Sequence, residues 1–95
     1  MRIGTVLVQG PSMVPTLRDG ECLLVKYGAV VRPGDVVVAR FRSRPGLLVV
    51  KRAVLAQDGG WLLSSDNPFV SGPVGVGDVE ARVLLRYWPP PRRLS

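Results

Sequence analysis

The feature of this sequence that most constrains its fold is the repeated alternation of short Val- and Leu-rich segments with turn-forming sequences. Many of these segments alternate apolar with polar residues, as half-buried strands do. The sequences between them, such as RDGE, RPGD and QDGG, are typical of tight turns. No segment carries a sustained helical period, and SMVPTL (12–17) admits at most one turn of helix. We therefore predict strands over residues 3–9, 21–27, 35–42, 47–56, 60–64 and 79–88.

These strands predict one small all-β domain. Ninety-five residues are enough for a single modest core. The segment AQDGGW predicts a hairpin between the fourth and fifth strands, and the whole pattern predicts a small, strongly bent antiparallel β-sheet that is barrel-like or two-layered. We expect residues 1–88 to form this domain. Residues 89–95, PPPRRLS, are expected to be a Pro/Arg-rich tail, because proline cannot pair in the interior of a sheet.

Several classes of protein are excluded by what the chain lacks. Its apolar runs are far shorter than the roughly 18 to 20 residues that a membrane span needs, and its first residues lack the features of a signal peptide. We therefore expect a soluble, cytoplasmic protein with no stable membrane anchor. Cys22 is the only cysteine and there is no histidine, so the usual zinc ligand sets are missing. We expect no metal and no cofactor.

The net charge of +6, with 13 basic against 7 acidic residues, can be a mark of nucleic-acid binding. Three arginines, Arg40, Arg42 and Arg44, alternate along one predicted segment. Of the six aromatic residues only Phe41 lies among them, whereas a single-strand binder would interleave aromatic and basic residues on one face. Solvated outer faces of strands also explain this charge, and we predict no nucleic-acid partner.

Ser12 is closely constrained by its neighbours. Gly10-Pro11 precede it and Pro15 follows three residues later. An ordinary turn would explain this pattern. A nucleophile would also explain it, since a nucleophile must be held rigidly with its backbone N–H free to face an oxyanion. Without histidine, such a serine needs another base, and lysine is the main alternative.

The chain has two lysines, Lys26 and Lys51. A lysine base must be neutral near pH 7, so its pKa has to fall from about 10.4 toward ~7 to 8, which requires burial or a nearby cation. Lys26 lies at a predicted strand end, where its ammonium reaches water. Lys51 lies mid-strand, and its own face carries only apolar residues: Leu47, Val49, Ala53 and Leu55. The alternative for Lys51 is an edge strand from which the side chain extends into solvent.

Taken together, these segments resemble the type I signal peptidases. GPSMVPTL resembles their Ser-Met-x-Pro-Thr nucleophile box, and VVKRAV resembles their general-base box. VRPGDVVVAR is similar to the segment between these boxes, and SSDNPFVSGPV resembles the later Gly-Asp-Asn box. The resemblance runs from about Val8 to Val83 and implies the small β-rich catalytic core of that family.

The resemblance also implies roles for individual residues. Ser12 corresponds to the nucleophile, whose backbone N–H contributes to the oxyanion hole, and Lys51 corresponds to the general base. Gly10 stands where many members of the family have a hydroxyl donor, so that donor is missing. The apolar substrate pocket of the family implies substrate-binding roles for Met13, Leu17 and Val50.

In the last box, Asp66 and Asn67 match the family and are implied to support the site. Ser71 corresponds to a serine that hydrogen-bonds the lysine in the family. Ser65, however, replaces the expected glycine, and the Asp-Ser-Arg that usually follows is absent. These departures affect the residues expected to hold Lys51 in place more than they affect Ser12 and Lys51 themselves.

Within this group, GPSMVPTLRDGE, RPGDVVVAR and the closing RYWP most resemble the nickel-type superoxide dismutase maturation proteases. This resemblance implies a serine endopeptidase that removes an N-terminal leader from a precursor protein, its partner and substrate. Three alternatives remain open. They are a signal peptidase acting on exported preproteins, a non-enzymatic basic β-barrel that binds a partner, and a degenerate protease that serves as a binding module.

Overall fold

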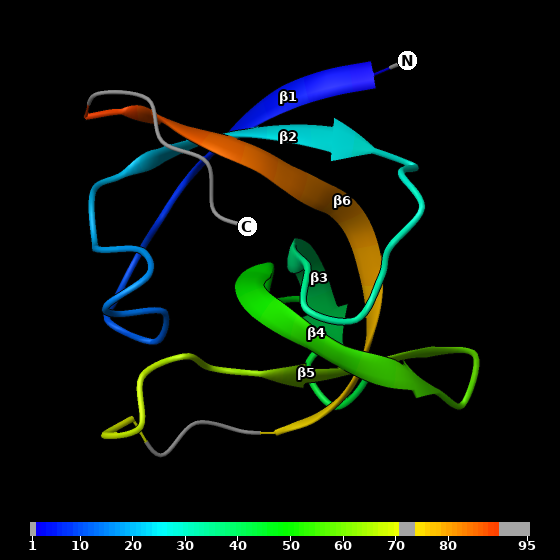
Figure 1. Cartoon of the computed structure of the whole chain (residues 1–95). Coiled ribbons are helices and arrows are strands. Elements are labelled where there is room, and N and C mark those ends of the chain that lie inside the picture. The colour runs from blue at the N-terminus through cyan, green and yellow to red at the C-terminus, as the bar shows by residue number, and fades with distance from the viewer. Residues whose placement is uncertain (1, 71–73, 90–95) are drawn as a thin grey trace.

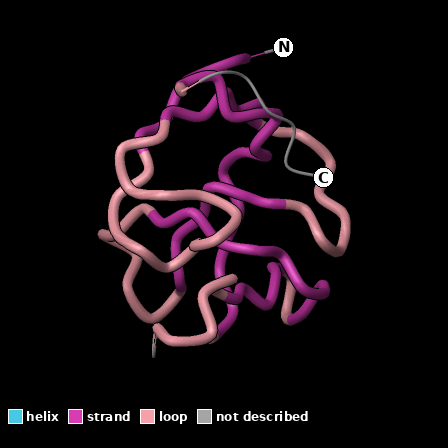
Figure 2. Tube along the Cα trace, turned by 60° about the vertical axis from the view of Figure 1, so that its left-hand side comes forward, coloured by secondary structure: helices cyan, strands magenta, loops and turns pink. Residues whose placement is uncertain are grey.

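The computed structural model describes residues 2–70 and 74–89, and within them it contains six strands and no helix (Figure 2). All strands pair antiparallel in one sheet of order β1-β2-β6-β3-β4-β5, and β5 also pairs with β6. The strands are β1 (Arg2–Leu7), β2 (Cys22–Tyr27), β3 (Val36–Phe41), β4 (Val49–Gln57), β5 (Gly60–Ser64) and β6 (Gly75–Trp88). The predicted all-β, antiparallel class is confirmed.

The longest strand, β6, joins the two halves of the sheet. It curves from the β1–β2 pair at one end to β5 at the other (Figure 1). Along its length it pairs in turn with β2, β3 and β5. Because β4 links β3 to β5, the strands β3 to β6 close on themselves, whereas β1 remains at an open edge. The predicted barrel-like bend is therefore made mainly by one strand that serves both halves.

The predicted hairpin between β4 and β5 is confirmed. Its last paired residues are Gln57 and Gly60, so Asp58 and Gly59 form a two-residue loop. Both have positive φ, 51° and 76°, as a type I′ turn requires, and Asp-Gly is a favoured sequence for that turn.

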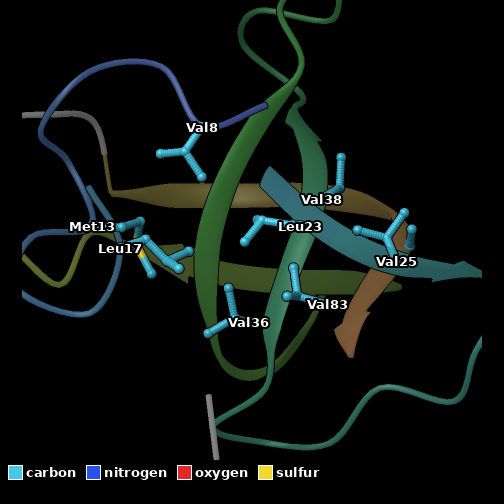
Figure 3. Packing of buried hydrophobic residues seen from close by; sticks show 9 residues of the cluster. Val8, Met13, Leu17, Leu23, Val25, Val36, Val38 and Val83 are labelled. Carbon is cyan, nitrogen blue, oxygen red and sulfur yellow. The ribbon is translucent and has the colours of Figure 1, made fainter. Parts of the chain in front are cut away.

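The buried side chains form two hydrophobic clusters, one on each face of β3. Val36 and Val38 belong to the first cluster, and Val37 and Ala39 to the second. This explains why the first four residues of β3, 36–39, are all apolar, because a strand segment buried on both faces has no polar side. Figure 3 shows most of the first cluster, which consists of Val8, Met13, Leu17, Leu23, Val25, Val36, Val38, Ala81 and Val83.

Several strand boundaries differ from the prediction, by four residues at the start of β6 and by one or two residues elsewhere. β6 begins at Gly75, four residues before the predicted start, because Gly75 and Gly77 weaken the strand signal in the sequence. β1 ends at Leu7. Val8 nevertheless stays attached to the β1–β2 pair, since its N–H donates to Glu21 O at 2.8 Å and its carbonyl accepts from Gly20 N–H at 2.9 Å.

Gly77 gives a stability prediction. It is buried in β6, and a Cβ at this position would collide with Leu63 Cδ1 and lie 2.7 Å from the carbonyl oxygen of Arg40. Gly77→Ala is expected to lower the free energy of unfolding by ~1–3 kcal/mol, the usual cost of overpacking a core. Gly46→Ala is the matched control, since a Cβ there meets nothing within 4 Å. Equal denaturant midpoints for the two variants would contradict the expectation.

Two predictions fall largely on residues that the structure does not describe. Ser71 lies in the range 71–73, and of the expected tail 89–95 only Pro89 is described. The described part of the chain contains no helical stretch with the length and hydropathy that crossing a bilayer requires.

Candidate active site

A cleft of about 410 Å³ lies between the segment that follows β1 and the start of β4. Ser12 and Lys51, which are distant in the sequence, both line this cleft. Most of its other wall residues are apolar and include Val8, Met13 and Leu48. The structure thus brings the two residues implied as nucleophile and base to one apolar cleft.

The loop that carries Ser12 is held at both ends. Gly10 has a φ of +83°, a left-handed conformation that favours glycine, and its N–H donates to Asp19 Oδ1 at 2.8 Å. This conformation explains why a hydroxyl-bearing residue is absent there. On the other side, Asn67 donates from its backbone N–H to Ser12 O and from Nδ2 to Pro11 O, both at 2.9 Å. Asn67 therefore fixes the backbone on which the candidate nucleophile sits.

The backbone N–H of Ser12 is available for a ligand. Among the described residues it donates no hydrogen bond, whereas the carbonyl of the same residue is occupied by Asn67. The chain then turns back into the protein, with Leu17 N–H donating to Met13 O at 2.9 Å. A second turn bond runs from Val14 N–H to Pro11 O at 3.1 Å, and both turns leave the Ser12 N–H free to contact a developing oxyanion.

Lys51 is the third residue of β4, a strand that lies between β3 and β5, and its partner on β3 is Val37. Its exposed fraction is 6%. The alternative of an edge-strand lysine extending into solvent is therefore wrong. Burial lowers the pKa of the Lys51 ammonium below its ordinary value. The Nζ atom donates a hydrogen bond to Ser65 Oγ at 2.9 Å.

Asp66 connects the segment of Ser12 to the strand of Lys51. Its carboxylate accepts from Thr16 Oγ1 at 2.5 Å, and from Arg52 Nε and Nη2 at 3.2 and 2.6 Å. Burial disfavours the ionised form, but the hydrogen bonds from Arg52 and Thr16 outweigh it and hold the pKa of Asp66 below its usual value. Arg52 Nη1 also donates to Gly34 O at 2.8 Å. The Asp66 carboxylate thus joins the segment of Ser12 to the strand of Lys51, and Arg52 extends this connection to the RPGD turn.

The three residues implied as substrate-binding occupy different positions. Met13 and the half-buried Val50 line the cleft, although only 1% of Met13 is exposed. Leu17 has no exposed surface and does not line the cleft. It packs in the first hydrophobic cluster with Leu23 and Val25. The expectation of substrate contact at Leu17 is thus corrected to a role beneath the loop, because the turn after Ser12 directs this side chain inward.

Sequence reasoning assigned no role to Ser65, Thr16 or Arg52 in the site. Thr16 and Arg52 belong to the two boxes that carry Ser12 and Lys51. Both have side chains that can donate a hydrogen bond to a carboxylate, and this property could have indicated a shared partner. Ser65 could have been noticed because it stands where the resembling family has glycine. Within the described residues, no group of three or more His, Cys, Asp or Glu side chains is placed to hold a metal ion.

A small β-domain that brings a serine and a buried lysine to one cleft has the architecture of a peptidase of the signal peptidase kind. The chain belongs to the Peptidase S24-like family, whose model matches residues 3–80. It is also similar to the mitochondrial ATP-independent inner membrane protease subunit 1a of Arabidopsis thaliana. The two are 31% identical over 121 residues, which cover 93% of this chain and 72% of the relative.

Proposed function

We propose that the protein is a serine endopeptidase in which Ser12 is the nucleophile and Lys51 is the general base. The observation that carries this proposal is the environment of Lys51. Only 6% of the residue is exposed, burial lowers the pKa of its ammonium, and it lines the same cleft as Ser12. A surface lysine would stay protonated near neutral pH and could not accept a proton from a serine hydroxyl.

The reaction then follows in two halves. Ser12 Oγ attacks the carbonyl carbon of the scissile bond while neutral Lys51 takes the hydroxyl proton, and the Ser12 N–H stabilises the oxyanion. The Lys51 ammonium gives this proton to the leaving amine as the C–N bond breaks, leaving an acyl-enzyme. Lys51, neutral again, takes a proton from the water that attacks the ester, and returns it to Ser12 Oγ as the ester C–O bond breaks, which releases the acid and restores the Ser12 hydroxyl.

The open edge of the sheet supports binding of an extended peptide. Among the described strands, β1 pairs only with β2, so its outer edge is free to add a strand by main-chain hydrogen bonds. Residues at the end of β1 line the cleft. A peptide paired with β1 would run toward Ser12 and place apolar side chains against Val8 and Val50.

The proposed substrate is a precursor protein with an N-terminal leader, and within this class a nickel-type superoxide dismutase precursor. The resemblance of GPSMVPTLRDGE, RPGDVVVAR and RYWP to the maturation proteases supports this choice. The similarity to a mitochondrial inner membrane protease subunit favours the second candidate, cleavage of exported preproteins. A cytoplasmic location is also part of the first proposal.

Incubation of the wild type and Ser12→Ala with both precursors, followed by sequencing of the new N-termini, tests the proposal. We expect one cut in the dismutase precursor and weaker cleavage of a preprotein ending in Ala-x-Ala. Each pocket contact can favour one precursor over the other by only ~1–3 kcal/mol of activation free energy. Some cleavage of both precursors is therefore expected. Preference for the preprotein would establish the second candidate.

A basic binding module is less well supported, because two of the alternating arginines are paired. Arg40 Nε lies 2.5 Å from Glu80 Oε2, and Arg42 Nη2 lies 2.9 Å from Asp78 Oδ1. These pairs reduce the charge that a phosphate backbone would meet. Binding to single-stranded nucleic acid that weakens strongly with salt would revive this alternative.

The lowered pKa of Lys51 predicts the pH dependence of cleavage. At low pH the lysine is protonated and cannot act as a base, so the rate should rise as the pH passes through its pKa, below the ordinary value of about 10.4. With no histidine in the chain, no second group of ordinary pKa near 6.5 produces an earlier rise. The measurement is kcat/KM against pH. A profile already flat from pH 5 upward would contradict a lysine base.

A further inference from the structure

Ser65 lies at the point where β5 has just ended, with its hydroxyl against the candidate base. Among the described residues, it is the one side-chain hydrogen-bond partner of Lys51, with Nζ and Oγ 2.9 Å apart. The contact is largely shielded from water, since Lys51 is 6% exposed and Ser65 is half-buried.

The residues on both sides of Ser65 are fixed. Ser64 is the last residue of β5 and pairs with Arg52, the neighbour of Lys51 on β4. Asp66 is bound by the side chains of Arg52 and Thr16. The backbone of Ser65 therefore lies between two anchored residues, which keeps its Cα beside Lys51.

A neutral lysine amine has two N–H donors and one lone pair, and rotation about its last C–N bond decides where that lone pair points. We infer that Ser65 is a positioning residue: its Oγ accepts one N–H of Lys51 and thereby turns the lone pair toward the Ser12 side of the cleft. This inference rests on the proposed function, in which Lys51 takes the proton of Ser12. The inference makes Ser65, at the position where the resembling family has glycine, the residue that holds Lys51 in place. The resemblance had implied this role for Ser71.

The Ser65 hydroxyl also acts on the protonated state. An oxygen that accepts a hydrogen bond from a buried ammonium stabilises the charged form. Removing it should lower the pKa of Lys51 further, while the loss of orientation lowers the rate at high pH, where the amine is already neutral. A purely structural serine would change neither quantity in this way.

The first test needs no substrate. Because the chain has only two lysines, a protein labelled with [13C]lysine at Cε gives two resonances, and Lys26→Met assigns them. We expect Ser65→Ala to move the titration midpoint of the Lys51 resonance to lower pH, and Ser65→Thr, which keeps the hydroxyl, to restore it. Ser64→Ala, which removes the neighbouring hydroxyl, should leave the midpoint unchanged. An unchanged midpoint in Ser65→Ala, or a shift produced by Ser71→Ala instead, would overturn the inference.

The second test uses cleavage. We expect Ser65→Ala to lower kcat at the alkaline plateau about tenfold with little change in KM, since a misplaced catalytic group costs rate and not binding. Its pH profile should shift to lower pH, as the resonance does. If Ser12→Ala and Lys51→Met are inactive while Ser65→Ala keeps the wild-type plateau and midpoint, the proposed function holds and the role of Ser65 fails. If Lys51→Met is active, it is the proposed function that fails.

Discussion

Replacement of Lys51 by methionine is expected to reduce kcat/KM by about 10³-fold or more, because a serine without a base is a weak nucleophile. Methionine is close to lysine in size and suits the apolar surroundings of Val37 and Ala53 on the same face, so the fold should persist. Lys51→Arg should be equally inactive, since a guanidinium does not lose its proton near neutral pH. Ser12→Ala should abolish cleavage as well. The measurement is turnover of a cleavable precursor, with circular dichroism as the check on folding.

Lys26→Met is the matched control for this prediction. It removes the other lysine, which lies on β2 and does not line the cleft, and it should leave turnover close to that of the wild type. Near wild-type activity in Lys51→Met, with Lys26→Met unchanged, would show that the reaction does not use Lys51.

The same substitution has a consequence for stability, with a definite sign. The pKa of Lys51 is lower in the folded state than in the unfolded chain, so the unfolded state binds more protons between the two pKa values. The stability of the wild type should therefore rise with pH in that range and level off below the folded pKa, where both states carry the proton. Lys51→Met lacks this dependence, so its advantage over the wild type should be largest at lower pH and disappear toward the pKa of a free lysine.

Asp66→Asn is expected to lower both activity and stability. The amide keeps the size of the carboxylate, but in either orientation its NH₂ group faces an N–H donor of Arg52, because both carboxylate oxygens accept from Arg52. Loss of this partly buried ion pair should cost ~2 kcal/mol of folding free energy. Because Thr16 follows Ser12 and Arg52 follows Lys51 in the sequence, the two reacting groups should also lose their relative placement. We expect kcat to fall ~10- to 100-fold, measured with the same precursor.

The chain offers a close control for Asp66→Asn. Asp78 is joined to Arg42 by the same two kinds of contact, Nε to one oxygen at 3.3 Å and Nη2 to the other at 2.9 Å. The Asp78 side chain is 63% exposed, however, whereas that of Asp66 is 16% exposed. Asp78→Asn should therefore change the denaturant midpoint little, since exposed ion pairs are screened, and leave kcat unchanged. Equal effects of both substitutions on kcat would refute the bridging role of Asp66.

Asp66 also makes the site sensitive to acid. The pKa of its carboxyl is held below the usual value of about 3.9. The stabilisation from this group is therefore complete above about pH 4 and is lost as the pH falls through the folded pKa. A wild-type acid-unfolding midpoint equal to that of Asp66→Asn would contradict this account.

Most of the fold could be read from local patterns. Period-two alternation and Asp-Gly turns are properties of a few neighbouring residues, and they located all six strands, with the main error at the start of β6. That error arose because Gly77 reads as a strand breaker. The structure shows instead that it lies in a ladder where Leu63 and the Arg40 carbonyl leave no space for a side chain.

The sequence by itself determined the all-β class and the β4–β5 hairpin, and a chain without histidine left few candidates for a nucleophile and its base. Only the tertiary structure decided which lysine is buried, that Leu17 supports the loop from the core, and that Ser65 contacts Lys51 while Asp66 joins Thr16 to Arg52. The physical reason is the distance along the chain over which each interaction acts. Turn and strand preferences act between neighbours along the chain, whereas burial of an amine and sharing of a carboxylate depend on residues that only the pairing of β3, β4 and β5 brings together.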